Sequence, residues 1–534
     1  MGYDSWRSAS SIALTRRDIL AGGGAMLAQL PALGSTTARG APHGEMTLAW
    51  HTAMAPRWLD PQEHDGAATP DNFLTALHDA LIKNSGTALY DHLSLAERYE
   101  VAKDGKSATF WLRDGIQFHN GEPVTPDDVK FSYENYRGAL ASAFKAKTEA
   151  VDIVDRRTVR FRFKEPFLDF PLLLGSGNVT GAGWVVPAKY YQQVGPDGFK
   201  RKPIGAGPYK LASAEAGVKL RFEAFEHYYR PVHIKSLTMI AVPEPATRLA
   251  MLERGEADLI YLLPGELIER VQKNPKLILA PVLSGSFWLE FVGFGDPKSP
   301  FHDKRVRQAV SLAIDRAAIN QAESAGFGKI SGNWINNDVQ YGLEWPEFEF
   351  NLEKARQLMR DAGHPKGFTV DWLTPLPPYY ARGERLVAQL QAIGIRAKLQ
   401  VMERGVFQQR SQAGKEQWPG VQMILQGARI GGTWSNWYES FFKCGGFNGA
   451  DRLCVAGLDA KLARYEASVD LAERKQLAEE VQRAILENYY VVPVFRHAFM
   501  NAIGPRIAAQ KWQDVFPTIT TGYAYPWEDI KLKE

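Results

Sequence analysis

The chain has 534 residues, of which 45% are hydrophobic and 23% are charged, a mixture typical of globular proteins. This length is enough for two or three domains with large cores. The formal net charge of +3 is too small to indicate nucleic-acid binding, and no apolar run reaches the roughly 20 residues that cross a bilayer.

Residues 1–40 show the three parts of an export signal. The pair Arg16 and Arg17 is followed by the weakly apolar run 19–33, and residues 38–40 fit a small-x-small cleavage site. The sequence therefore predicts a twin-arginine signal peptide, and the alternative is a chance arginine pair on a flexible tail. No cysteine lies near the cleavage site, so we expect a soluble periplasmic protein without a lipid anchor.

The chain contains two cysteines, Cys444 and Cys454. In an oxidising compartment two cysteines this close are expected to form a disulfide that closes a short loop. The alternative is a pair of free thiols.

Strand and helix patterns alternate through the first half of the mature chain. We expect strands at residues 46–52, 107–113 and 158–163, and a helix at residues 72–83. Residues 203–211, with the sequence PIGAGPYKL, are a glycine-rich turn that leads into a strand. No GK[ST] follows these glycines, so the sequence does not predict a phosphate-binding loop.

Two pairs of like-charged residues invite a functional interpretation. Asp127 and Asp128 follow Thr125, which is expected to cap a helix with a proline at its first position. Adjacent residues in a first helical turn point in different directions, so we expect capping here and not acid–base chemistry. Arg305 and Arg307 are expected to lie on a solvated helix face.

The second half continues the alternation. Gly255 is expected to end a helix in residues 245–260 that leads into a strand, and Asp303 to cap a helix in residues 301–316. Further helices are expected at residues 351–363, 384–393 and 471–489, with strands at residues 395–401 and 491–495. Alternating strands and helices predict an α/β fold.

One long segment carries a family resemblance. Residues 95–136, LAERYEVAKDGKSATFWLRDGIQFHNGEPVTPDDVKFSYENY, resemble the signature region of the periplasmic solute-binding proteins of ATP-driven peptide, nickel and opine importers. Residues 56–62 (PRWLDPQ), 203–211 and 301–316 (FHDKRVRQAVSLAIDR) resemble further motifs of this family, so the resemblance covers nearly all of residues 45–534.

The resemblance implies the two-lobed periplasmic binding-protein fold (large cluster, type II), with a hinge and an extra inserted subdomain. On this basis the first lobe takes residues 41–285 and contains the insert at about 86–200. The second lobe takes residues 286–505, and residues 506–534 return to the first lobe.

The resemblance also implies a function. A solute is held between the lobes, which close by hinge bending, and is delivered to an inner-membrane ABC permease and its ATPase subunits. We expect a monomer that binds no nucleic acid and has no cofactor. We also expect no catalysis, because no GxSxG, HExxH, Walker or CxxC motif is present. The scattered histidines predict no metal site. Two alternatives stay open: a metal or metal-chelate binding protein of the same family, and a periplasmic enzyme or chaperone on this scaffold.

The family's dipeptide binders suggest which ligand to expect. In them an aspartate takes the α-ammonium group, and an arginine before a tyrosine takes the α-carboxylate. The tyrosine corresponds to Tyr380, the arginine to Pro378, and the aspartate to Ile430 or a neighbour, beside Arg429. A buried ammonium group without a carboxylate partner costs several kcal/mol. We therefore expect a peptide-like or opine-like solute that is anionic or N-blocked.

Aromatic residues are further candidates for ligand contacts. Trp434 and Trp437 flank a glycine-rich loop and suit stacking on a planar or sugar-like group, and the alternative is core packing. Trp288 is expected near the crossover into the second lobe. His51 follows the first strand, where loops often face a ligand, although a structural histidine is the alternative.

Overall fold

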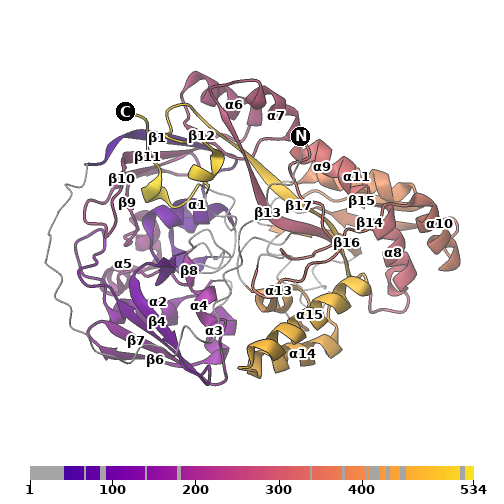
Figure 1. Ribbon diagram of the computed structural model, residues 1–534, viewed down its shortest axis with the longest axis horizontal. Coiled ribbons are helices and arrows are strands. Elements are labelled where there is room, and N and C mark those ends of the chain that lie inside the picture. Colours follow the sequence, from indigo (N-terminus) through magenta and orange to yellow (C-terminus); the bar gives the residue numbers. More distant parts are fainter. Residues whose placement is uncertain are drawn as a thin grey trace, which may run out of the picture. The chain divides into compact units, whose positions relative to one another are not determined.

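The computed structural model describes residues 41–64, 68–83, 92–138, 141–176, 182–336, 339–375, 379–402, 406–407, 410, 420–427, 433–445, 453–516 and 524–534 (Figure 1). The expected signal peptide, residues 1–40, lies outside the described residues. Among the described residues, no helix combines the length and hydropathy needed to span a membrane.

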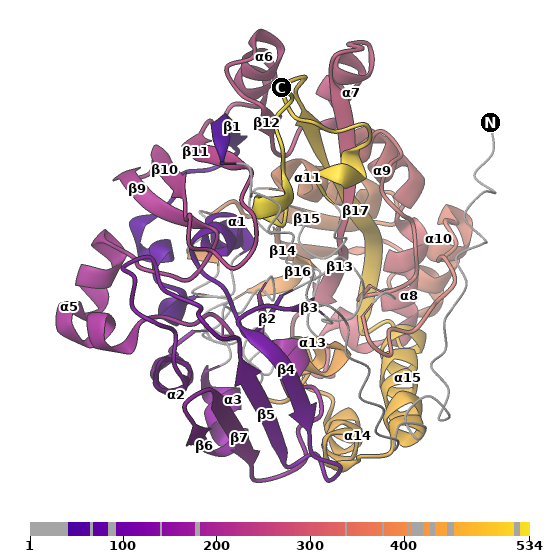
Figure 2. The ribbon, with the colours of Figure 1, turned by 60° about the vertical axis from the view of Figure 1, so that its left-hand side comes forward.

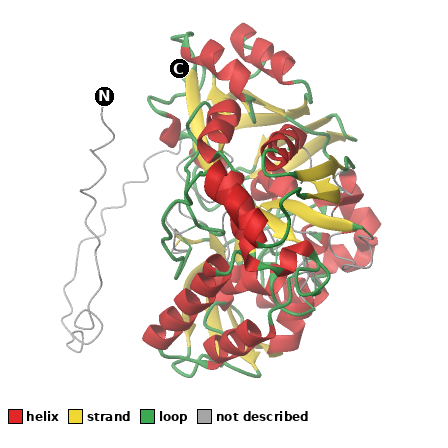
Figure 3. Cartoon of the chain, turned by 90° about the vertical axis from the view of Figure 1, so that its right-hand side faces the viewer, coloured by secondary structure: helices red, strands yellow, loops and turns green. Residues whose placement is uncertain are grey.

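The largest sheet of the described residues has ten strands in the order β15-β14-β16-β13-β17-β12-β1-β11-β10-β9. Its strands are β1 (His43–Trp50), β9 (Tyr209–Glu215), β10 (Lys219–Ala224), β11 (Ile234–Ala241), β12 (Leu259–Ile260), β13 (Ile278–Phe291), β14 (Phe368–Thr374), β15 (Ile395–Leu399), β16 (Val421–Gly427) and β17 (Val491–Ile503). Figure 3 shows helices packed around the strands.

Two long antiparallel strands, β13 and β17, join the two halves of this sheet (Figure 1). At one end, Leu259 and Ile260 of β12 pair with Ile503 and Ala502 of β17. At the other end, β13 pairs with β16. The register between β13 and β17 shifts between Leu283 and Ser286, so the ladder is interrupted where one half of the sheet passes into the other.

Three large hydrophobic cores lie in the described part of the chain. The first core takes buried residues from Met46 to Val282 and from Ile503 to Leu532, the second from Leu81 to Ala206, and the third from Phe287 to Phe495. The second core is built on a separate antiparallel sheet of order β4-β5-β7-β6. The smaller strands are β2 (Ile82–Lys83), β3 (His92–Leu93), β4 (Ala96–Val101), β5 (Ser107–Leu112), β6 (Thr148–Asp155), β7 (Thr158–Phe163) and β8 (Gly175–Ser176).

The helices are distributed over all three cores. They are α1 (Ala68–Leu77), α2 (Pro126–Asn135), α3 (Ala141–Lys147), α4 (Phe170–Leu173), α5 (Ala188–Arg201), α6 (Pro245–Arg254), α7 (Gly265–Gln272), α8 (Lys304–Ala313), α9 (Arg316–Ser324), α10 (Leu352–Asp361), α11 (Tyr380–Gln391), α13 (Trp434–Phe441), α14 (Ala456–Ala467) and α15 (Leu471–Glu487). Short 3-10 turns are η2 (Pro56–Leu59), η3 (Pro61–Glu63), η4 (Pro300–His302), η6 (Trp512–Asp514) and η7 (Trp527–Asp529).

The expected helix ends are confirmed. Thr125 caps the start of α2, and its backbone N–H donates to the Asp128 carboxylate at 2.9 Å. Asp303 caps α8. Gly255 ends α6 with a φ of 75°, a left-handed conformation that glycine adopts without steric cost. The disulfide is also confirmed, because Cys444 and Cys454 are bonded with their Cα atoms 4.5 Å apart.

Two expectations are wrong. The helix expected at residues 72–83 ends at Leu77, and Ile82 and Lys83 form strand β2. Lys83 belongs to a buried group of charges that is described in the Discussion. Arg307 is buried and not solvated, since its guanidinium donates to the carbonyls of Phe301 and Asn488.

Candidate functional site

The carboxyl ends of parallel strands in both halves of the sheet point toward the middle of β13 and β17. In one half of the sheet, β1 runs parallel to β11 and β12, and in the other half β14 runs parallel to β15 and β16. Because Leu259 pairs with Ile503 and Ile260 with Ala502, β12 runs from the end of β17 toward its middle. Because Phe291 pairs with Met423 and Phe287 with Gly427, β16 runs toward the middle of β13 from the other side. Ligands of open α/β sheets bind outside the carboxyl ends of strands. This edge is therefore the candidate site.

Aromatic rings follow the edge from one half of the sheet to the other. Trp50, at the end of β1, stacks on Tyr261, with ring centroids 4.1 Å apart, and His51 lies 5.0 Å from Tyr261. Tyr261 contacts Phe499 of β17 at 5.4 Å, and Phe499 contacts His497 at 5.5 Å. The expected position of His51 at the end of the first strand is confirmed, and the edge offers stacking surfaces.

A buried arginine lies beside His497 on the side of the third core. Arg382 is 1% exposed, and its Nε donates to the Glu323 carboxylate at 2.7 Å. Its Nη2 lies 3.2 Å from His497 Nδ1, and its guanidinium carbon lies 3.9 Å from the centre of the Phe287 ring. Burial, followed by the charge of Arg382, holds the pKa of His497 well below its usual value. The imidazole is therefore neutral, and Nδ1 accepts from the arginine.

Polar side chains of the third core form a second part of the edge. Thr374 is opposite Ile424, and Gln426, two residues further along β16, is opposite Trp288, so these side chains share one face of the sheet. Trp288 Nε1 donates to Glu290 Oε1 at 3.2 Å on the same face.

Several buried polar atoms at this edge have no hydrogen-bond partner among the residues that the structure describes. Ser286 Oγ donates to Asn336 Oδ1 at 3.3 Å, which leaves the amide nitrogen of Asn336 unbonded. The Gln426 amide nitrogen and the Thr374 hydroxyl are likewise buried without a partner. An unsatisfied buried polar group costs about 1–3 kcal/mol. Two of these groups are donors only and the third can donate, so they suit a ligand rich in acceptor atoms.

Comparison with known proteins gives the family. Residues 92–446 match the sequence model of the bacterial extracellular solute-binding proteins, family 5 (middle). The chain belongs to this family. It has the two-lobed fold of periplasmic binding proteins, and the family consists of binding proteins of ABC importers.

Three relatives of this family 5 protein bind different solutes. The dipeptide-binding protein of Escherichia coli K12 is 25% identical over 520 residues, covering 85% of this chain and 94% of the relative. The binding protein AgaA from A. tumefaciens R10, solved with agropinic acid, has a TM-score of 0.75 and 21% identity over 92% of this chain and 99% of its own. NikA from Brucella suis, solved with Fe(III)-EDTA, has a TM-score of 0.75 and 20% identity over 92% of this chain and all of its own.

The remaining predicted ligand contacts of the family 5 protein have different environments. Tyr380 begins α11, and its hydroxyl donates to the Met402 carbonyl at 2.5 Å. Trp288 lies on β13, the strand that passes between the two halves of the sheet, and is fully buried. Trp434 and Trp437 on α13 are buried in the third core. Arg429, Pro378 and Ile430 lie outside the described residues. A role in ligand binding stays a prediction for Tyr380, Trp288, Trp434, Trp437 and Arg429, whereas Pro378 and Ile430 are only the positions where the family's arginine and aspartate are missing.

Sequence reasoning missed Tyr261, Arg382, Asn336 and Gln426. Tyr261 directly follows the expected strand at the end of residues 245–260, which is the same signal that selected His51. Arg382 lies in the segment PLPPYYAR that also contains Tyr380. No local pattern marks the amides of Asn336 and Gln426, because they become buried only when distant strands pair and other segments pack over them.

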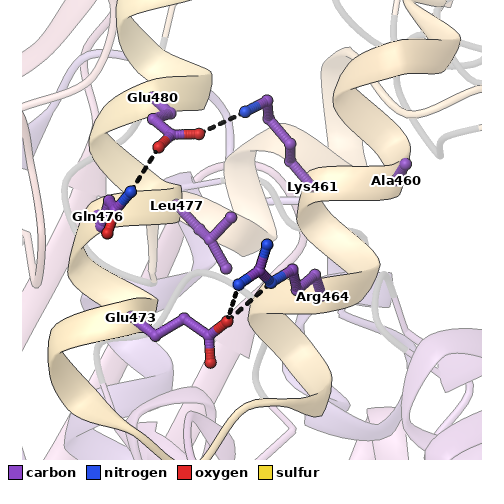
Figure 4. A pocket seen from close by; sticks show the side chains of 7 residues that line it. All are labelled: Ala460, Lys461, Arg464, Glu473, Gln476, Leu477 and Glu480. Carbon is purple, nitrogen blue, oxygen red and sulfur yellow. Dashed lines mark hydrogen bonds and ion pairs between the residues drawn. The ribbon is translucent and has the colours of Figure 1, made fainter.

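A hollow on the surface between α14 and α15 is not a comparable site (Figure 4). Lys461 forms an ion pair with Glu480, and Arg464 Nε donates to Glu473 at 2.7 Å. Each of these charges is paired with an opposite charge on the facing helix, so the ion pairs hold the two helices together. Elsewhere in the described part of the chain, no three His, Cys, Asp or Glu side chains are placed to hold a metal ion.

Proposed function

We propose that this protein captures a peptide-like or opine-like solute, anionic or N-blocked, between its lobes and delivers it to an inner-membrane ABC permease and its ATPase subunits. In this proposal residues 41–285, including an insert at about 86–200, and residues 506–534 form the first lobe. Residues 286–505 form the second lobe. The observation that carries the proposal is that strand carboxyl ends from both halves of the sheet point toward the middle of β13 and β17, where buried polar groups lack partners among the described residues.

The chemical class follows from the groups at this edge. The free nitrogens of Asn336 and Gln426 require acceptors, and carboxylate and amide oxygens supply them. The aromatic surfaces of Trp50 and Tyr261 suit the rest of an amide or sugar-like solute. The ligands of two of the similar proteins, a dipeptide and agropinic acid, belong to these chemical classes.

The remaining parts of the proposal follow from the sequence and the family. Residues 1–40 direct twin-arginine export to the periplasm, where the protein acts as a monomer without covalent chemistry. The site residues proposed are Arg429, Trp434, Trp437, Tyr380, Trp288 and His51, together with Tyr261, Asn336, Thr374 and Gln426.

Mass spectrometry of the small molecule that co-purifies with the protein tests the proposal. We expect an acidic or N-blocked amide-containing solute that also binds in a calorimetric titration at micromolar concentration or below. Ordinary free dipeptides binding below micromolar concentration would contradict the proposed ligand class. Turnover of any bound compound would contradict binding without chemistry.

A metal chelate is the second candidate, because NikA from Brucella suis was solved with Fe(III)-EDTA. A chelate presents carboxylate acceptors to the protein, so it suits the same donors and needs no protein ligands to the metal. Metal analysis of protein purified from the periplasm distinguishes the two: a stoichiometric transition metal favours the chelate, and its absence together with an organic solute favours the peptide-like or opine-like ligand.

A further inference from the structure

A buried charge connects the second and third cores. Asp169 lies directly before α4, and its carboxylate accepts from Arg474 Nη2 at 2.6 Å and from the hydroxyls of Ser435 and Tyr465, each at 3.0 Å. These partners belong to α15, α13 and α14; Figure 2 shows α3 of the second core beside α13 and α14. Asp169 is 6% exposed and Arg474 is 2% exposed, so water does not screen this pair.

The third core holds Arg474 in position by itself. Its Nη1 donates to the carbonyls of Tyr465 and Ser468, at 2.8 and 3.3 Å, and its guanidinium carbon lies 3.8 Å from the centre of the Tyr465 ring. None of these contacts involves the second core. The helices of the third core therefore form a preorganised receptor for one carboxylate, and Asp169 fills it.

A second ion pair crosses the same boundary. Lys147, the last residue of α3, lies 2.5 Å from Glu466 and 3.4 Å from Glu439. A cavity of about 20 Å³, lined in part by Asp169 and Arg474, lies beside these pairs. This volume has room for about one water.

We infer that Asp169 and Arg474 form an affinity-determining contact that the protein makes only when its lobes close. The inference rests on the proposed function, in which the second and third cores belong to different lobes. Opening returns both charges to water, and closure buries them together. Because the free energy of closing adds to the free energy of binding, these residues set the solute affinity without touching the solute.

Asp169→Asn tests the contact, since it leaves Arg474 buried against an uncharged amide. We expect solute affinity to fall on the order of 10- to 100-fold, mainly through faster dissociation. Tyr465→Phe removes one hydroxyl and no charge, and should weaken affinity by about 3- to 10-fold. Asp152→Asn is the matched control, because the ion-pair partner of Asp152 among the described residues is the exposed Arg162 of its own sheet.

Comparison of the unliganded and solute-saturated proteins separates this inference from the proposed function. Hydrogen exchange and X-ray scattering report closure and contact between α4 and helices α14 and α15 directly, whatever the chemical class of the solute. Protection of these helices on solute binding that is reduced in Asp169→Asn, together with weaker solute affinity, supports the contact. Wild-type exchange together with wild-type affinity in both Asp169→Asn and Tyr465→Phe overturns it, whatever solute is found.

Discussion

Two buried groups of charges in this protein have similar chemistry and different locations. In the first core, Lys83 Nζ lies 2.8 Å from Glu528 and 3.1 Å from Asp79, and all three side chains are almost fully buried. Between the second and third cores, Asp169 meets Arg474 at a similar depth. The first group links β2, beside Ile82 of the second core, to segments of the first core, so it lies inside the proposed first lobe, whereas the second group joins the two proposed lobes. The same interaction therefore stabilises the fold in one place and a conformation in the other.

The first group also contains a second cation and a hydroxyl that bonds to one of its carboxylates. The Tyr228 hydroxyl donates to Asp79 at 2.6 Å, and Arg230 Nη1 lies 2.7 Å from Glu528. Burial alone would raise the pKa of Glu528, but the charges of Lys83 and Arg230 outweigh it, and the pKa is lowered. Asp79 lacks the second cation, and its burial raises its pKa. The carboxylate nearer to two cations is therefore the one whose pKa is lowered.

The largest expected effect is on the group within the first core. Lys83→Met leaves Asp79 and Glu528 buried without their shared cation, so we expect a loss of about 3–5 kcal/mol in the free energy of unfolding. Urea denaturation measures it. Lys130→Met is the control, because Lys130 pairs with the exposed Glu134 and should cost less than about 1 kcal/mol. Equal losses in the two variants would show that burial does not distinguish these pairs.

The next largest effect is a pH dependence of the free energy of unfolding. Burial lowers the pKa of His78 to about 3 and of His119 to about 4. The unfolded chain therefore takes up protons below about pH 6.5 that the folded chain does not, and stability falls with pH from there to about 4. Each histidine contributes about 1.4 kcal/mol per pH unit.

Urea denaturation between pH 7 and pH 4.5 tests this, with His119→Gln as the variant. Removing one histidine should reduce the slope of stability against pH by about 1.4 kcal/mol per unit. An unchanged slope would mean that His119 is protonated in the folded protein. Solute affinity of the folded variant should stay at the wild-type value.

A double-mutant cycle sharpens the comparison between the two groups. Asp169→Asn and Arg474→Met should show a coupling energy of at least about 1 kcal/mol when solute affinity is measured by calorimetry. Asp169→Asn combined with Lys83→Met should be additive within about 0.5 kcal/mol in the free energy of unfolding, because the two groups share no partner. Coupling in unfolding with Lys83→Met would contradict the separation of the two groups.

The smallest effect is expected at the surface. Asp152→Asn removes an exposed partner of Arg162 and should change the free energy of unfolding by less than about 1 kcal/mol, with no change in solute affinity. Thermal unfolding and calorimetry on the same preparation check both values. A change in affinity here would mean that charge anywhere on the second core affects closure.

The sequence by itself determined the features that depend on near neighbours. Thr125 with Asp128, Asp303 and Gly255 mark helix ends because the capping groups lie within a few residues of the backbone atoms they serve. The disulfide follows from two cysteines ten residues apart. The alternation of strands and helices was sufficient for the α/β class, and the motifs in residues 95–136 for the family.

Only the tertiary structure decided the features that need partners far along the chain. The helix expected to reach residue 83 stops at Leu77, whose carbonyl accepts from the backbone N–H of Gly207, and Lys83 pairs with Glu528, 445 residues away. The strand expected at residues 491–495 runs on to Ile503, because β13 and β12 continue to pair with it. Local sequence cannot specify such partners, since a buried charge or an open strand edge is satisfied by whatever segment the fold brings to it.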